Sequence, residues 1–205
     1  MTRFLSTIIA STFLIASSCW AGPKVVFETS LGNITIELDE ENAPDSSANF
    51  LKYVDAKHYD GIIFHRVIKG FMIQTGGFAL EEGGDVKQKK SNDEIKNEAD
   101  NGLKNKRGTL AMARTSDPHS ASAQFFINHG DNNNLDHTSK TQAGWGYAVF
   151  GKVIEGMEVV DKIADVETAR QVLHALHPSG QHMPQPMGDV PVEKIVIKSA
   201  KRLEE

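Results

Sequence analysis

The sequence of 205 residues has a single cysteine, Cys19, near its amino terminus. One cysteine cannot form an intramolecular disulfide or a cysteine-rich zinc site, so counting excludes both. The chain also has no excess of positive charge, since 22 lysines and arginines stand against 27 aspartates and glutamates. General binding to nucleic acid depends on clustered basic residues that neutralise phosphates. We therefore expect no nucleic-acid partner.

The most apolar stretch lies at the amino terminus and is too short to span a membrane. A short positive start precedes a mostly apolar segment over 4–15, and small residues follow up to Ala21. This order is typical of a secretory signal peptide, so we expect a signal peptide over 1–21 and a mature domain over 22–205. A membrane span needs about 20 apolar residues. A lipid anchor on Cys19 is the less favoured alternative.

The mature chain begins with alternating apolar and polar residues over 25–30 and 34–38. The intervening Leu31-Gly32-Asn33 favours a hairpin. Apolar residues then recur at helical spacing over 43–56, which predicts an amphipathic helix. A second short helix is expected over 157–163. The hydrophobic period thus switches from two to about four early in the chain.

Short apolar runs bounded by Gly, Asn, Asp or Pro occupy most of the remaining chain. They lie at 62–68, 71–74, 109–113, 124–128, 147–153 and 192–199. Many short strands with few helices favour a mainly β fold. A closed antiparallel barrel is the expected form, because closure removes exposed strand edges.

Two polar segments, 78–98 and 167–191, are predicted to lie at the surface, outside this framework. The second contains His174 and His177, whose spacing would place both on one face of a helix as possible metal ligands. No third ligand follows from the spacing, so we predict no metal site there.

One segment, 64–77 (FHRVIKGFMIQTGG), brings together a cation, an amide and apolar side chains. It places Arg66 just before a turn at 69–70. Side chains alternate along a strand, so Met72 and Gln74 share one face of the strand that follows. These groups can converge on one surface.

A second segment, 121–128 (ASAQFFIN), shows the same alternation. Phe125 and Ile127 can fill a core, while Gln124 and Phe126 share the opposite face. An aromatic ring on an outer face is costly, so Phe126 is expected to be covered by a ligand or a loop.

At these segments the sequence resembles the cyclophilins, the prolyl cis-trans isomerases, and most of all their periplasmic bacterial branch. The likeness covers about 25–164 and resumes at the last strand. Besides FHRVIKGFMIQTGG and SAQFFIN it includes GTLAMART (108–115), Leu135-Asp136 and GYAVFGKV (146–153). It implies an eight-stranded antiparallel barrel capped by two α-helices, with the substrate groove on the outer barrel wall.

The resemblance also implies an enzyme that rotates X-Pro bonds in proline-containing polypeptides, without a cofactor or metal. Arg66 is then the catalytic residue, donating a hydrogen bond to the prolyl nitrogen when the amide twists. The substrate-binding residues implied by the family are Phe71, Met72, Gln74, Ala113, Gln124, Phe126, Leu135 and Tyr147. His65 suggests acid-base chemistry, but strand alternation turns it away from Arg66, so we predict a structural role.

Three positions depart from the pattern of many family members. Tyr147 stands where many eukaryotic members carry histidine, and Arg114 stands where they carry asparagine. Asn134 replaces a tryptophan or phenylalanine, and the tryptophan matters for cyclosporin binding. We therefore expect weak cyclosporin binding. The polar loop 131–143 also carries an apparent insertion, which makes the pocket rim the least predictable part.

Taken with the signal peptide, the resemblance predicts a periplasmic protein that assists the folding of exported proteins. Two alternatives remain: a chaperone that holds proline segments without turnover, and a secreted binding module on the same fold. Arg66 favours the enzyme, because binding an apolar proline ring does not require a guanidinium group. Nothing in the sequence indicates an obligate interface, so a monomer is expected.

Overall fold

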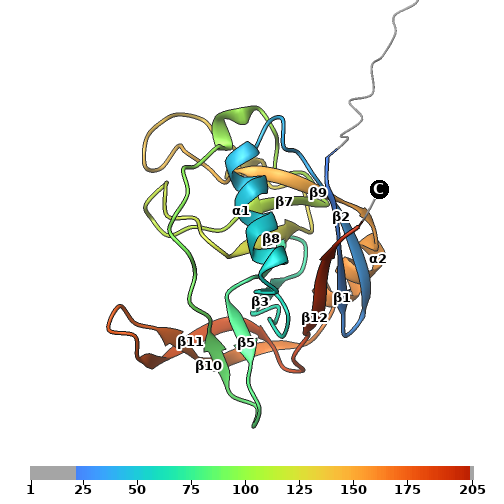
Figure 1. The fold of residues 1–205 in the computed structure, drawn as a ribbon, viewed down its shortest axis with the longest axis vertical. Coiled ribbons are helices and arrows are strands. Elements are labelled where there is room, and N and C mark those ends of the chain that lie inside the picture. The colour runs from blue at the N-terminus through green and yellow to red at the C-terminus, as the bar shows by residue number, and fades with distance from the viewer. Residues whose placement is uncertain (1–21, 204–205) are drawn as a thin grey trace, which may run out of the picture.

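The computed structural model describes residues 22–203 and contains two sheets and two α-helices (Figure 1). The helices are α1 (Pro44–Asp55) and α2 (Met157–Ala164). The strands are β1 (Lys24–Thr29), β2 (Gly32–Leu38), β3 (Arg66–Ile68), β4 (Met72–Thr75), β5 (Phe78–Leu80), β6 (Val86–Gln88), β7 (Thr109–Met112), β8 (Phe125–Asn128), β9 (Val149–Glu155), β10 (Thr168–Leu176), β11 (His182–Pro191) and β12 (Ile197–Arg202). Two short 3₁₀ turns lie at Ala99–Asn101 and Asn133–Leu135.

The amino-terminal hairpin is confirmed, with β1 and β2 paired in antiparallel register. The Thr29 hydroxyl donates a hydrogen bond of 2.6 Å to the Gly32 carbonyl and closes the turn. Gly32 has a φ of +136°, and a Cβ atom there would lie 2.8 Å from Val159 of α2. Glycine at this turn therefore permits both the turn conformation and the close approach of α2.

Helix α1 is also confirmed, and one side of it packs into the main hydrophobic core. Phe50 contacts Phe27, Tyr59, Phe125 and Phe150, with ring centroids 5.3 to 6.0 Å apart. These rings come from α1, three strands and a loop. Aromatic packing of this kind joins the helix to the concave side of the large sheet.

The large sheet has the strand order β12-β1-β2-β9-β7-β8-β4-β3 and is a curled, open half-barrel. The predicted closed eight-stranded barrel is therefore wrong in this respect. Residues ahead of β3 do approach β12: Ile63 makes one antiparallel bridge to Val196, and Ile197 N donates to Ile62 O at 2.8 Å. Because β3 has only three residues and this bridge is isolated, the two edges do not join in a continuous ladder.

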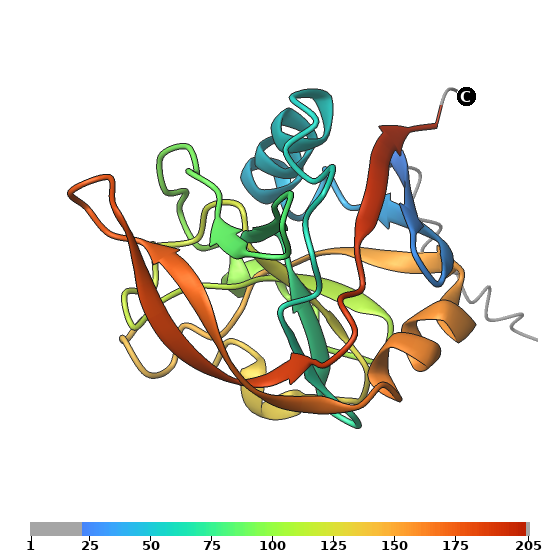
Figure 2. The ribbon, with the colours of Figure 1, turned by 90° about the horizontal axis from the view of Figure 1, so that it is seen from below.

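The two segments predicted to lie at the surface outside the strand framework, 78–98 and 167–191, instead contribute strands to a second, four-stranded sheet, although β11 is mostly exposed. Its order is β11-β10-β6-β5, and β10 and β11 form a long antiparallel hairpin that projects from the molecule (Figure 2). Leu173 and Val190 in this hairpin are buried against Ile63, Phe78 and Val86. Sequence patterning missed the hairpin because prolines and charges interrupt its alternation.

The histidine spacing considered for a metal does not lie on a helix. His174 is in β10 and His177 follows that strand. In the part of the chain that the structure describes, no three or more histidine, cysteine or acidic side chains cluster as metal ligands would. Within the same residues, no helix is long and apolar enough to cross a membrane. The predicted signal peptide over 1–21 and Cys19 lie outside the described residues.

Candidate active site

Three strands of the large sheet place the key side chains in one row. The β3–β4 register sets Arg66 opposite Gln74, and the β4–β8 register sets Gln74 opposite Phe126. On the far side, β7 sets Ala111 opposite Phe126. Directly opposed residues share one face of a sheet, so a cation, an amide and an aromatic ring lie side by side.

A pocket of about 130 Å³ opens on this face, the one opposite the main core. It is lined by Arg66, Phe71, Met72, Gln74, Ala113, Arg114, Phe126, Leu135 and Tyr147. Of the predicted site residues only Gln124 is missing from this set. It lines an adjoining cavity of about 290 Å³ together with Gln74 and Ala113. Gln74 Nε2 donates to Gln124 Oε1 at 3.0 Å, so the two amides link the cavities.

The floor of the pocket is apolar. Met72, Ala111, Phe126 and Val149 form a buried cluster, with Phe71, Leu135 and Tyr147 packed against it. Phe126 is only 4% exposed. The expected cover is supplied in part by Tyr147, whose ring lies 5.6 Å away at 74° to the Phe126 ring.

Arg114 also lines the pocket, although it was absent from the predicted substrate-binding set. Its guanidinium lies 4.7 Å from the centre of the Tyr147 ring. Its Nε donates to the Gly146 carbonyl at 2.9 Å, and Nη1 donates to the Thr115 carbonyl. Arg114 therefore holds the Tyr147 side of the pocket in place. The GTLAMART motif contains this arginine but does not indicate where its side chain points.

His65, the neighbour of Arg66 in the chain, is turned away from the pocket as predicted. It is fully buried, and its ring packs against Phe78 with centroids 4.8 Å apart. Burial lowers the pKa of His65 to about 4, because a charged ring would lose its hydration. The ring is therefore neutral at physiological pH, and its contacts indicate a structural role.

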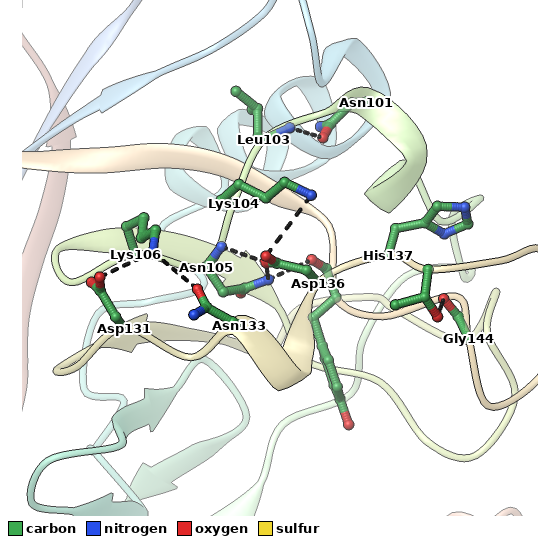
Figure 3. A network of polar contacts seen from close by, with 12 residues as sticks. Asn101, Leu103, Lys104, Asn105, Lys106, Asp131, Asn133, Asp136, His137 and Gly144 are labelled. Carbon is green, nitrogen blue, oxygen red and sulfur yellow. Dashed lines mark hydrogen bonds and ion pairs between the residues drawn. The ribbon is translucent and has the colours of Figure 1, made fainter.

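The pocket rim is held by a polar network that the sequence did not reveal (Figure 3). Asn105 donates to Asp136 Oδ1 twice, from the backbone N at 2.8 Å and from Nδ2 at 3.1 Å. The same Nδ2 lies 3.4 Å from the Tyr147 carbonyl. Asn105 is buried, so these bonds lie away from competing water. They tie both rim residues to Asn105: Leu135 through its neighbour Asp136, and Tyr147 through its own carbonyl.

A second set of contacts holds the start of the same rim. Lys106 Nζ lies 3.0 Å from Asp131 and 2.9 Å from Asn133 Oδ1. Asn134 lies in the adjacent 3₁₀ turn and is exposed. The rim loop is thus anchored at several points, although its sequence is polar and has no strand or helix pattern.

The fold and this pocket define a class of protein with an apolar recess on an outer sheet face, bordered by two arginines and the amide of Gln74. The family model for "Cyclophilin type peptidyl-prolyl cis-trans isomerase/CLD" matches residues 24–202. The chain therefore belongs to the cyclophilin family of peptidyl-prolyl cis-trans isomerases.

Relatives with isomerase names match almost the whole chain. It is 54% identical over 179 residues to a peptidyl-prolyl cis-trans isomerase of Streptomyces antibioticus, covering 87% of this chain and 98% of the relative. It is 48% identical over 203 residues to peptidyl-prolyl cis-trans isomerase A of Dickeya dadantii, covering 97% and 96%. Peptidyl-prolyl cis-trans isomerase B of Escherichia coli is 51% identical over 173 residues, with 84% and 98% covered.

Solved structures agree with these relatives. A cyclophilin type isomerase of Cryptosporidium parvum superposes with a TM-score of 0.66 at 25% identity, covering 89% of this chain and 98% of that one. The same protein was also solved in the presence of the dipeptide Ala-Pro. The chain is a peptidyl-prolyl cis-trans isomerase, and the comparisons give no support to a binding module without turnover.

Proposed function

We propose that Arg66 is the catalytic residue and that the 130 Å³ pocket receives the proline ring of the substrate. Rotation about a prolyl bond meets a barrier of about 20 kcal/mol, because the amide has partial double-bond character. No covalent bond breaks in this reaction. The task of the protein is to bind the twisted amide better than either planar form.

Arg66 suits this task because the largest change on twisting the amide is at the prolyl nitrogen. In the twisted state the prolyl nitrogen regains its lone pair and accepts a hydrogen bond that the planar amide accepts poorly. A guanidinium at the pocket edge donates to that nitrogen and so favours the transition state over the ground state. Each ~1.4 kcal/mol of such preference gives tenfold in rate, so about 7 kcal/mol gives on the order of 10⁵-fold.

The other pocket residues bind and orient the substrate. The apolar floor of Met72 and Phe126 accepts the ring, with Phe71, Leu135 and Tyr147 around it. Gln74 and Gln124, bonded to each other, present amide groups to the substrate backbone on the side of Ala113. The observation that carries this proposal is the cross-strand row of Arg66, Gln74 and Phe126.

The test is the cis-to-trans rate of a short prolyl peptide with the wild-type chain and Arg66→Ala. We expect the variant to be slower by tenfold or more. Arg202→Ala is the matched control, because Arg202 is similarly exposed but pairs with Asp55 on another part of the molecule. Circular dichroism shows whether each variant is folded. A folded Arg66→Ala variant as fast as the wild type would contradict the catalytic role.

We also propose that residues 1–21 direct export to the periplasm and are then removed by cleavage after Ala21. There the protein acts as a monomer on proline-containing segments of exported proteins. The signal-like order of residues 1–21 supports the export. Amino-terminal sequencing of the protein from the periplasmic fraction tests it, and an intact Met1 would contradict it. Sedimentation of the purified chain tests the monomer.

Cyclosporin binding is proposed to be weak, since Asn134 gives the exposed rim turn a small polar side chain instead of an aromatic ring. Inhibition by low nanomolar cyclosporin would contradict this. Asn134→Trp is expected to tighten inhibition without changing the uninhibited rate.

A further inference from the structure

The long hairpin of the second sheet reaches the proposed catalytic arginine. Strand β11 lies beside β3, the strand that begins with Arg66. Asp189 of β11 places its Oδ2 atom 3.7 Å from Arg66 Nε, and the two side chains are 48% and 40% exposed. The contact therefore approaches the guanidinium from its Nε side. The same side chain lines the pocket.

A β-bulge aims Asp189 at this position. The β10–β11 ladder pairs Ala169 with Val190 and then Gln171 with Met187, so Gly188 and Asp189 together stand opposite Arg170. Such a bulge leaves an extra residue on one strand and redirects its side chain, and bulges are common next to active sites. Asp189 also has a φ of +59°, which is uncommon for a residue with a side chain.

Both residues of the Asp189–Arg66 contact lie close to the same buried cluster at the base of the hairpin. Val190, next to Asp189, is fully buried in the cluster that includes Phe78 and Ile63, and Ile63 lies three residues before Arg66. Asp189 and Arg66 therefore extend from segments that are packed against each other. An unusual backbone conformation persists only where the surrounding structure holds it, and such conformations concentrate at functional sites.

We propose that Asp189 is a positioning residue, which holds the Arg66 guanidinium in the orientation that donates to the prolyl nitrogen. The proposal rests on the catalytic role proposed for Arg66. A free arginine side chain samples many rotamers, and a fixed carboxylate on its Nε side reduces that freedom before substrate arrives. Both side chains are partly exposed, so the attraction is modest and weakens with salt.

The experiment uses Asp189→Asn and Asp189→Gly. Both residues tolerate a positive φ, so the bulge is retained while the charge is lost. At low ionic strength we expect each variant to lower kcat about three- to fivefold, with a smaller change in KM. In high salt the wild type is expected to approach the variants. Asp55→Asn, which removes an equally exposed aspartate-arginine pair far from the pocket, is expected to leave the rate unchanged.

A direct readout of positioning is the ¹⁵N relaxation of the Arg66 Nε–H group. We expect this group to become more mobile on the ps–ns timescale in both Asp189 variants. A normal rate and unchanged mobility in the variants would overturn the proposal, and so would a slower rate with unchanged mobility. Arg66→Ala is measured in parallel. If it stays fast, the catalytic role of Arg66 itself fails, and the positioning role falls with it.

Discussion

Arg114 illustrates how a single residue can shape the pocket through its neighbours. Its guanidinium lies over the Tyr147 ring and bonds to two carbonyls, one of them at Gly146 directly before the tyrosine. Tyr147 in turn covers Phe126. The wall of the proposed proline pocket therefore depends on an arginine that acts through Tyr147 and Gly146.

Arg114→Met keeps the length of the side chain and removes the guanidinium. We expect KM to rise about three- to tenfold with a smaller change in kcat. The variant loses a cation–π contact and two hydrogen bonds of about 1 kcal/mol each, and part of this lost free energy orders the Tyr147 ring. Steady-state kinetics on a prolyl peptide measures this. Arg107→Met, an exposed arginine paired with Asp161, is the control. Equal KM values for both variants would contradict the role of Arg114.

At the scale of elements, two buried or half-buried polar groups join segments that are far apart in the chain. Asn105 links the 3₁₀ rim turn to the strand region before β7. Glu98 accepts hydrogen bonds from the backbone of Asp45 and from the backbone and hydroxyl of Ser46, at the start of α1. Glu98 thus accepts from backbone donors at the start of α1 that the helix itself leaves open, whereas Asn105 donates to a carboxylate beyond the rim turn.

Asn105→Ala is expected to loosen the pocket rim. The change removes the Nδ2 bonds to Asp136 Oδ1 and to the Tyr147 carbonyl, and it removes the Oδ1 acceptor of the Asn128 amide. We expect a loss of about 1–3 kcal/mol in unfolding free energy. We also expect a higher KM, since Tyr147 loses its bond to Asn105 and Leu135 keeps only the backbone link through Asp136. Urea unfolding and steady-state kinetics report the two effects. Asn134→Ala, an exposed change in the same loop, is expected to be nearly neutral in stability, and equal losses would contradict the prediction.

Glu98→Ala is expected to destabilise the protein by about 1–2 kcal/mol without changing kcat, because α1 loses the carboxylate that caps its first turn. Helix α1 lies on the core side of the sheet and does not line the pocket. Thermal unfolding monitored by circular dichroism measures the loss, with exposed Glu193→Ala as the control. An unchanged melting temperature for Glu98→Ala would show that the contact contributes nothing.

For the whole molecule, the buried ring of His65 makes stability depend on pH. Its pKa is lowered to about 4 in the folded chain, from an ordinary value near 6.5. Between these two pH values the unfolded chain binds more protons at this histidine than the folded chain does. The free energy of unfolding therefore falls as the pH drops from about 6.5 to about 4, and above that range His65 causes no loss. The shift corresponds to about 3 kcal/mol across this window.

His65→Phe removes the titrating group and keeps a flat ring beside Phe78. The unfolding free energy of the wild type is expected to fall between pH 7 and pH 4. That of His65→Phe is expected to fall by about 3 kcal/mol less over the same range. Urea unfolding at several pH values measures the difference. His177→Gln, on an exposed histidine, serves as the control. Parallel pH profiles for the wild type and His65→Phe would contradict the prediction.

Local patterns by themselves determined the hairpin of β1 and β2, both helices, the inward faces of Phe125 and Ile127 and the outward face of Phe126. Each depends on a side-chain period or a turn residue, which adjacent positions encode. The motifs also identified the family. Alternation placed Arg66 and Gln74 on strands, but only the register of β3, β4 and β8 brought them together with Phe126.

The tertiary structure alone decided whether the sheet edges meet, what the 167–191 segment does and how the pocket rim is held. The open half-barrel depends on the spatial relation of β3 and β12. Strand β3 ends at Ile68 and β12 begins at Ile197, 129 residues later, so the two strands share no local pattern. The β10–β11 hairpin depends on burial of Leu173 and Val190 against a distant strand. Asn105, Glu98 and Asp189 act through contacts between segments far apart in the chain. Such contacts are set by packing of the whole chain, which no short stretch of sequence contains.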